Sequence, residues 1–194
     1  MPSNLHQLTT KIASLSKSGL STSARKLFDE MPLKDSITWN AMLSSYSQLG
    51  LHKIALSLFH LMRITNARPD HFTFTSTLNA CSGLGSLQNG TKIHALVIAF
   101  GYQSFLPVNN SLIDMYGKCL FPYSARKVFE EMGQSQRNEV TWCSLLFAYA
   151  NSGQFHIAFE TFYGMLKRVL VAWNIMISGF ARYGEVEVCL NLYQ

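Results

Sequence analysis

The feature that most constrains the fold of this chain is a nearly duplicated nonapeptide. Residues 23–31 read SARKLFDEM and residues 124–132 read SARKVFEEM, so seven of the nine positions are identical at an offset of 101 residues. The two differences, Leu to Val and Asp to Glu, keep the chemical character of the side chain. The duplication indicates either a repeated site or an array of structural repeats, so the internal period has to be established first.

The stretch 36–70 contains two helical patterns. In both patterns apolar residues recur at spacings of three and four, which gives one apolar stripe on a helix. The first stripe consists of Trp39, Met42, Leu43 and Tyr46. The second stripe consists of Ala55, Leu58, Phe59 and Met62. Gly50 separates the two patterns and Pro69 closes the stretch, which indicates an antiparallel helix hairpin of 35 residues.

The same frame fits almost the whole chain. It gives units 5–35, 36–70, 71–105, 106–138 and 139–169, followed by a partial unit, 170–194. Most second helices carry a small residue and, four residues later, an aromatic one: Ala24 and Phe28, Ala55 and Phe59, Ala125 and Phe129, Ala158 and Phe162. The two nonapeptides fall in the second helices of the first and fourth units. The sequence therefore predicts an all-α fold, a right-handed α-solenoid of stacked antiparallel helix hairpins.

The small residues are expected to let the two helices of a hairpin approach closely, and the aromatic residues to fill the gap between neighbouring hairpins. The last unit stops inside its second helix, where it keeps only Cys189 and Tyr193 of the pattern. We therefore expect the chain to be a piece of a longer array, because an exposed repeat end normally carries a polar cap.

Composition narrows the function classes. The formal charge of +5 and the pI near 9.1 favour an acidic partner. Four cysteines lie far apart, without the close spacing that a zinc site needs, so we expect buried thiols, no metal and no cofactor: Cys81, Cys119, Cys143 and Cys189. No apolar run reaches the length that spans a bilayer. The segment before Asp29 has no acidic residue, which is typical of an organellar transit peptide, but it also fits the first repeat.

Four first helices carry a family signature. The segments ITWNAMLSSYSQLG, VTWCSLLFAYANSG, VAWNIMISGFARYG and NNSLIDMYGKC resemble the first helix of pentatricopeptide repeats. SARKLFDEMPLKD resembles the short class of that repeat, and the unit 71–105 resembles the long class. The mixture of lengths is similar to the mixed-length subfamily of land plants. The resemblance covers residues 5–194 and implies an α-solenoid that binds single-stranded RNA, in mitochondria or chloroplasts.

The resemblance implies that each repeat contacts one RNA base. In the family, the fifth and the last residue of a repeat select the base, and Asn or Thr can both donate and accept there. The corresponding residues are Thr9 with Asp35, Asn40 with Asp70, Thr75 with Phe105, Asn110 with Asn138, Cys143 with Val169, and Asn174, whose unit is cut short. Phe105, Cys143 and Val169 depart from the family pattern. The resemblance therefore implies the site G-U-N-Y-N, running 5′ to 3′ with the chain.

Two further positions of the first helix carry expected contacts. In the family, the second residue covers a base face, which here assigns stacking to Ile37, Phe72, Val140 and Val171, with His6 and Pro107 at the same place. A basic thirteenth residue approaches phosphate, which points to Lys17, Lys118 and Arg182. Positions two, five, nine and thirteen share one face of a helix. Structural alternatives stay open: the tryptophans fit the core, Asp35 and Asp70 fit helix N-caps, and the three cations fit plain surface charge.

Two other functions compete with RNA binding. A peptide-binding scaffold of the tetratricopeptide type would keep a constant 34-residue period, whereas these units have 31, 35, 35, 33 and 31 residues. An RNA-editing deaminase domain needs the motifs H-x-E and C-x-x-C, which the sequence lacks. We therefore expect no catalysis by this chain. In a role in organellar RNA processing such as C-to-U editing, the editing activity would then come from a missing C-terminus or from helper proteins.

Overall fold

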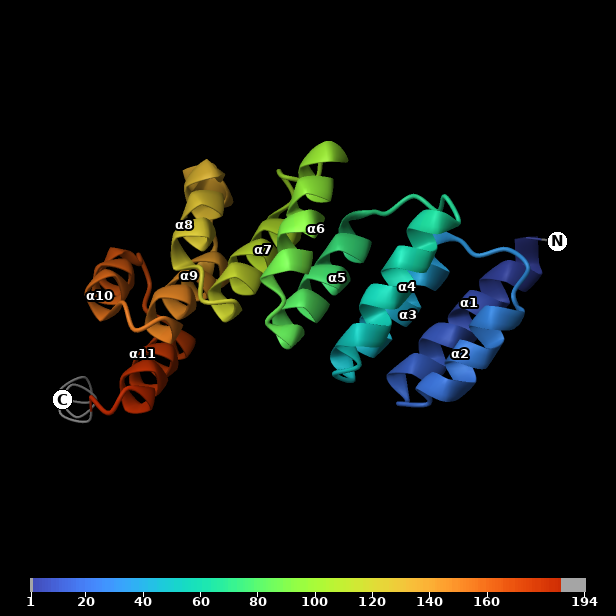
Figure 1. The fold of residues 1–194 in the computed structure, drawn as a ribbon, viewed down its shortest axis with the longest axis horizontal. Coiled ribbons are helices and arrows are strands. Elements are labelled where there is room, and N and C mark those ends of the chain that lie inside the picture. Colours follow the sequence, from blue (N-terminus) through green and yellow to red (C-terminus); the bar gives the residue numbers. More distant parts are fainter. Residues whose placement is uncertain (1, 186–194) are drawn as a thin grey trace. The chain divides into compact units, whose positions relative to one another are not determined.

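The computed structural model describes residues 2–185, in which α-helices and one short 3-10 turn are the regular elements. Figure 1 shows the helices in chain order. They are α1 Pro2–Lys17, α2 Ser21–Glu30, α3 Ser36–Gln48, α4 His52–Ile64, α5 His71–Leu84, α6 Leu87–Ala99, α7 Leu106–Lys118, α8 Pro122–Glu131, η1 Gln134–Gln136, α9 Glu139–Asn151, α10 Phe155–Gly164 and α11 Leu170–Arg182. The prediction of an all-α fold is confirmed.

Short loops join consecutive helices, which makes them antiparallel hairpins. Helices α3, α5, α7, α9 and α11 begin at Ser36, His71, Leu106, Glu139 and Leu170, the residues at which the expected units begin. Helix α1 begins at Pro2, ahead of the expected start at Leu5. The partial unit continues into residues 186–194, so its Cys189 and Tyr193 lie outside the described residues.

The chain divides into two compact parts, residues 1–102 and residues 103–194. In the first part, α1, α3 and α5 pack side by side as one layer, and α2, α4 and α6 pack against that layer. In the second part, α7, α9 and α11 pack side by side, and α8 and α10 pack against them. Each part is therefore a stack of helix hairpins in two layers, as the sequence predicts.

Aromatic pairs connect neighbouring hairpins within each part. The ring of Phe28 meets the ring of Trp39 edge to face, with centroids 4.9 Å apart. The equivalent pairs are Phe129 with Trp142 at 4.8 Å and Phe162 with Trp173 at 4.7 Å. Such pairs contribute about 0.5–1.5 kcal/mol beyond the burial of their area. The second-helix aromatics therefore fill the gap between hairpins, where Trp39 is buried and Trp142 and Trp173 are half-buried.

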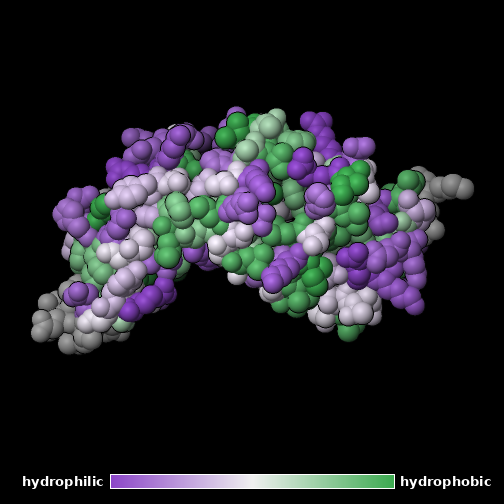
Figure 2. All heavy atoms as spheres, in the orientation of Figure 1, coloured by the Kyte–Doolittle hydropathy of each residue, from purple (hydrophilic) through white to green (hydrophobic). Residues whose placement is uncertain are grey.

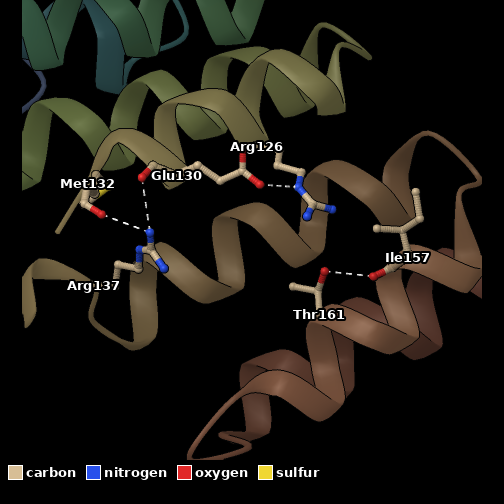
Figure 3. Close-up of polar contacts among 6 residues, drawn as sticks. All are labelled: Arg126, Glu130, Met132, Arg137, Ile157 and Thr161. Atoms are coloured by element: carbon tan, nitrogen blue, oxygen red, sulfur yellow. Dashed lines mark hydrogen bonds and ion pairs between the residues drawn. The ribbon is translucent and has the colours of Figure 1, made fainter. Parts of the chain in front are cut away.

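In three hairpins, a basic side chain donates hydrogen bonds to carbonyl oxygens at the C-terminal end of the second helix. Arg137 donates from Nη2 to the carbonyl oxygens of Met132, at 2.9 Å, and Glu130, at 3.4 Å (Figure 3). Its guanidinium carbon also lies 4.2 Å from the centroid of the Phe129 ring. Lys34 and Arg168 stand at the same place, next to last in their units, and cover Phe28 and Phe162. These cations bind the free carbonyl groups of a helix end while shielding its aromatic residue.

The two nonapeptides form the same surface ion pair. Arg25 donates from Nε to both carboxylate oxygens of Asp29 at 2.8 Å, and Arg126 donates from Nε to Glu130 at 2.6 Å (Figure 3). The hydrogen bond to Glu130 raises the pKa of Arg126 above its ordinary value. Both side chains of the Arg126 pair are about half exposed, so the pair contributes at most about 1 kcal/mol. The exchange of Asp for Glu between the nonapeptides preserves this contact.

The turn inside a hairpin needs a left-handed backbone. Gly50 provides it between α3 and α4, with φ at +74°. Leu120 stands at the same place between α7 and α8 and adopts φ of +64°. For a residue with a Cβ, that conformation costs about 1–2 kcal/mol. Packing of the hairpin therefore overrides the local preference at Leu120.

A close helix contact in the second part supports a testable prediction. A Cβ added at Gly117 on α7 would lie 2.9 Å from the Cβ and 3.0 Å from the Cα of Ala148 on α9. Neither atom can move without its helix, so Gly117→Val is expected to lower the free energy of unfolding by about 1–3 kcal/mol. Gly164→Val is the matched control, because a Cβ there meets only Trp142 at an ordinary 3.7 Å. Equal unfolding midpoints of the two variants in urea would contradict the close contact.

Three of the four cysteines lie in the described residues, and Cys81, Cys119 and Cys143 are all buried, as predicted. Burial raises the pKa of the Cys119 and Cys143 thiols, with nearby carboxylates adding to the effect. Thiols of raised pKa are poor nucleophiles and poor metal ligands. Of the helices between residues 2 and 185, none combines the length and the apolar character needed to cross a membrane.

Candidate functional site

The second residues of the first helices form a recurring set of exposed apolar side chains. Ile37 is 63% exposed, Phe72 61%, and Val140 and Val171 57% each. Figure 2 shows apolar and hydrophilic residues intermingled on the face that it presents, so one exposed apolar residue carries little meaning. Recurrence at one helical position is different, because the buried stripe of each helix lies on another face. These four side chains are free to cover a flat ligand.

The second and third hairpins bring Asn40, Asp70 and Thr73 together in the first part of the chain. Asn40 donates from Nδ2 to both carboxylate oxygens of Asp70, each at 2.9 Å. The hydroxyl of Thr73 donates to Asn40 Oδ1 at 2.6 Å. Asp70 also caps α5 by accepting the Thr73 backbone N–H at 2.9 Å. The fifth and last residues of the unit 36–70 therefore lie in direct contact.

The second part contains an equivalent cluster of Asn110, Asn138 and Thr141. The hydroxyl of Thr141 donates to Asn110 Oδ1 at 2.7 Å. Asn138 caps α9 by accepting the Thr141 backbone N–H at 3.0 Å. No hydrogen bond joins the Asn110 amide nitrogen to Asn138 in the part of the chain that the structure describes. The Asn110 amide is therefore held through its oxygen, whereas the Asn40 amide is held at both ends.

The first hairpin boundary has the same arrangement with a threonine at the fifth place. The hydroxyl oxygens of Thr9 and Thr38 lie 2.8 Å apart, and Asp35 caps α3 by accepting the Thr38 backbone N–H at 2.8 Å. Thr9 also donates to the carbonyl oxygen of Leu5 at 2.9 Å. It is only 4% exposed, so its hydroxyl faces the protein interior far more than solvent.

The remaining fifth and last residues offer less polar chemistry. Thr75 is half-buried, and its hydroxyl donates to the carbonyl of His71 in its own helix at 2.7 Å. Phe105 and Val169 precede α7 and α11 without a side-chain cap. Asn174 is exposed. Val140, Cys143, Val169 and Val171 line one apolar groove in the second part, with the carboxylates of Asp114 and Glu139 at its edge.

The three cations expected near phosphate differ in their surroundings. Lys17 is exposed at the end of α1. Lys118 forms an ion pair with Asp114, with Nζ and Oδ2 2.8 Å apart. Arg182 donates to the side-chain oxygen of Asn151. The side-chain nitrogen of Asn151 donates to the carbonyl oxygen of Gly117 at 3.1 Å. Two of the three cations therefore have protein partners, whereas Lys17 makes no ion pair or side-chain hydrogen bond with the described residues.

The sequence analysis missed Thr38, Thr73 and Thr141, the third residues of their helices. All three are fully buried and contact the fifth residue of the preceding unit. A signal was present, because each stands three residues after an Asp or Asn, the spacing of a helix-capping box. The predicted caps Asp35 and Asp70 are confirmed. In the described residues, no three His, Cys, Asp or Glu side chains lie close enough to hold a metal ion.

Comparisons with known proteins agree with these observations. The family model described as the PPR repeat family matches residues 34–83. The model described as the PPR repeat matches residues 12–35, 110–136, 140–169 and 171–194. Together they cover most of the chain.

Curated relatives come from Arabidopsis thaliana. A pentatricopeptide repeat-containing protein labelled mitochondrial is 56% identical over 190 residues, covering 98% of this chain and 30% of the relative. Another pentatricopeptide repeat-containing protein is 39% identical over 166 residues, covering 85% of this chain and 27% of the relative. The chain thus spans less than a third of the length of these relatives.

Solved structures share the fold. The maize pentatricopeptide repeat protein PPR10, crystallised with an 18-nucleotide psaJ RNA element, aligns with 95% of this chain and 29% of its own, at a TM-score of 0.75 and 20% identity. The PPR domain of Arabidopsis thaliana protein-only RNase P 1, crystallised with tRNA, aligns with 91% of this chain and 98% of its own, at 0.68 and 16%. The matched repeats, the curated relatives and the stacked hairpins establish that the chain belongs to the pentatricopeptide (PPR) repeat family.

Proposed function

We propose that this chain binds single-stranded RNA and selects bases with the fifth and last residues of its repeats. The observation that carries the proposal is the contact between Asn40 and Asp70, flanked by exposed Ile37 and Phe72. It combines a polar amide of fixed orientation with apolar side chains that can cover a base. A related cluster recurs around Asn110 on a separate part of the chain, where a threonine hydroxyl again holds the amide oxygen.

The RNA complexes of PPR10 and of the RNase P 1 PPR domain support the proposal, because both share this fold. The net charge of +5 also suits a polyanion. The reading units of the proposal are 5–35, 36–70, 71–105, 106–138 and 139–169, with 170–194 as the start of a sixth.

The base assignment comes from the family resemblance, and the amide geometry is compatible with it. Asn40 uses one N–H on Asp70 and one oxygen lone pair on Thr73, which leaves one donor and one acceptor for a base. Uracil offers a matching N3–H beside a carbonyl oxygen. Asn110 keeps both amide hydrogens free of Asn138. The resemblance assigns it a pyrimidine, preferably cytosine. These two repeats supply the U and the Y of the proposed site G-U-N-Y-N.

The first, third and fifth places of the proposed RNA site face repeats without a comparable amide. At the fifth place, Cys143 and Val169 line an apolar groove that offers no amide to a base edge, so any base is accepted there. At the third place, Thr75 uses its hydroxyl within its own helix. Thr9 is buried, so its hydroxyl gives no geometric argument for a base at the first place. The guanine there rests on the family resemblance alone.

The proposal extends to the biological role of the chain. The alternation of unit lengths supports membership of the mixed-length plant subfamily, and the mitochondrial label of the 56% identical relative supports an organellar location. We place the chain in site recognition for organellar RNA processing, such as C-to-U editing, with catalysis left to other segments or to helper proteins. A chloroplast location stays compatible with the same role.

Selection from a randomised single-stranded RNA library tests the proposed function. The purified chain is expected to enrich sequences with U and Y two places apart, preceded by G. Each well-read base should contribute about 1–3 kcal/mol of discrimination, or roughly 5- to 150-fold in affinity. Binding without enrichment would reject the base assignment. A folded chain that binds no RNA would reject the function and favour a peptide-binding scaffold of tetratricopeptide type.

A further inference from the structure

Base selection by a repeat requires a third residue, which belongs to the following repeat. Building on the proposed RNA binding, we propose that Thr73 and Thr141 are positioning residues for base selection. Each stands third in its helix and orients the fifth residue of the preceding repeat. They act through Asn40 and Asn110 and touch no base themselves.

The hydrogen-bond count at Thr73 sets the direction of the contact. Its hydroxyl oxygen accepts the backbone N–H of Asp70 at 3.1 Å, and it has a single hydrogen to give. The two acceptors in reach are Asn40 Oδ1 at 2.6 Å and Asp70 Oδ1 at 3.1 Å. The shorter distance assigns the hydrogen to Asn40. Since the Asp70 carboxylate can only accept, the Asn40 nitrogen must face Asp70 and its oxygen must face Thr73.

This arrangement allows one orientation of the Asn40 amide. An amide turned by 180° would point its oxygen at the Asp70 carboxylate and its N–H groups at the Thr73 hydroxyl. Asp70 opposes that turn, but it contacts only the nitrogen of the amide. Thr73 anchors the other end from a fully buried position on α5, where its side chain has little freedom. The donor and acceptor left for a base are thereby fixed in order.

The same assignment holds in the second part of the chain. Thr141 accepts the backbone N–H of Asn138 at 3.2 Å and lies 2.7 Å from Asn110 Oδ1. The competing acceptor, Asn138 Oδ1, is farther at 2.9 Å and already receives the Thr141 backbone N–H. At this boundary Thr141 is the residue that holds the amide, because Asn138 makes no bond to the Asn110 nitrogen.

The distribution of the threonines along the chain supports their role. A threonine stands third after each of the three boundaries at which the last residue is polar: Asp35, Asp70 and Asn138. The two boundaries closed by Phe105 and Val169 are followed by Val108 and Ala172, which have no hydroxyl. The threonine therefore accompanies the boundaries that can read a base and is missing from the two that cannot.

Thr73→Val tests the proposal, because valine keeps the shape of threonine and removes its hydroxyl. The preference for U over C at the second RNA base is expected to fall about threefold to tenfold, the range of one neutral hydrogen bond. The preference at the fourth base should not change. Thr73→Ser restores the hydroxyl and should restore the preference to within about twofold. Thr77→Val is the matched control, since Thr77 is equally buried on α5 and bonds only its own helix.

A second measurement uses the free protein and needs no RNA. In nuclear magnetic resonance spectra, the side-chain amide of Asn40 should be ordered in the wild type and in Thr73→Ser, and mobile in Thr73→Val. Unchanged Asn40 order and an unchanged U preference in Thr73→Val would overturn the proposal, as would an equal loss in Thr77→Val. A wild-type chain that prefers no base would reject the proposed function alone, because the amide order still decides the role of Thr73.

Discussion

Replacement of Phe28 by alanine is expected to lower the free energy of unfolding by about 3–5 kcal/mol, the cost of removing a buried phenyl ring. Phe28 is fully buried, and its ring packs edge to face on Trp39 of the next hairpin at 4.9 Å. The ammonium group of Lys34 lies 5.0 Å from the centroid of the same ring. The loss therefore combines a cavity, an aromatic pair and a cation contact at one boundary between hairpins.

The measurement is urea unfolding followed by circular dichroism. Leu33→Ala is the control, because Leu33 lies in the following loop, is 73% exposed and should shift stability by less than about 0.5 kcal/mol. Repeat arrays unfold through their weakest boundary, so Phe28→Ala should also separate the first hairpin from the rest before global unfolding. A loss below 1 kcal/mol would show that the first boundary does not depend on this ring.

The sequence predicted the hairpins well because their determinants are local. The stripe from Trp39 to Tyr46 and the turn at Gly50 appear as helical spacing and a break within one stretch of chain. The aromatic at Phe28 could be assigned to the boundary because its spacing repeats. By contrast, Leu120 gave no turn signal, since its left-handed backbone is imposed by packing rather than by residue preference.

The candidate site was less predictable, because its contacts join residues about 30 positions apart. The pairing of Asn40 with Asp70 came from the family resemblance, and spacing alone would not have found it. Thr73 was not among the predicted site residues, because only the three-dimensional contact shows that its hydroxyl reaches Asn40. The pairing of Lys118 with Asp114 and of Arg182 with Asn151 likewise depends on side-chain directions that the sequence does not specify.

Exchanging the last residues of two repeats is expected to exchange their bases. The double variant Asp70→Asn, Asn138→Asp gives the repeat 36–70 the residue pair now found in 106–138, and the reverse. The preferred RNA should then change from G-U-N-C-N to G-C-N-U-N. Each base contributes roughly tenfold, and the two sites lie in separate parts of the chain, so the affinity ratio of the two RNAs should invert from about 100:1 to about 1:100.

The exchange is built to leave everything else in place. Asp and Asn are equally good helix N-caps, and both residues accept the backbone N–H of a threonine three residues later, so stability should change little. The formal charge of the chain stays the same, which keeps non-specific attraction to RNA constant. What changes is the number of bonds on the amide: Asp70 holds the Asn40 nitrogen with two oxygens, and asparagine cannot. If the exchanged variant kept its preference for U at the second base, the carboxylate at Asp70 would not be what selects uracil, and the selection would belong to Asn40 and Thr73 alone.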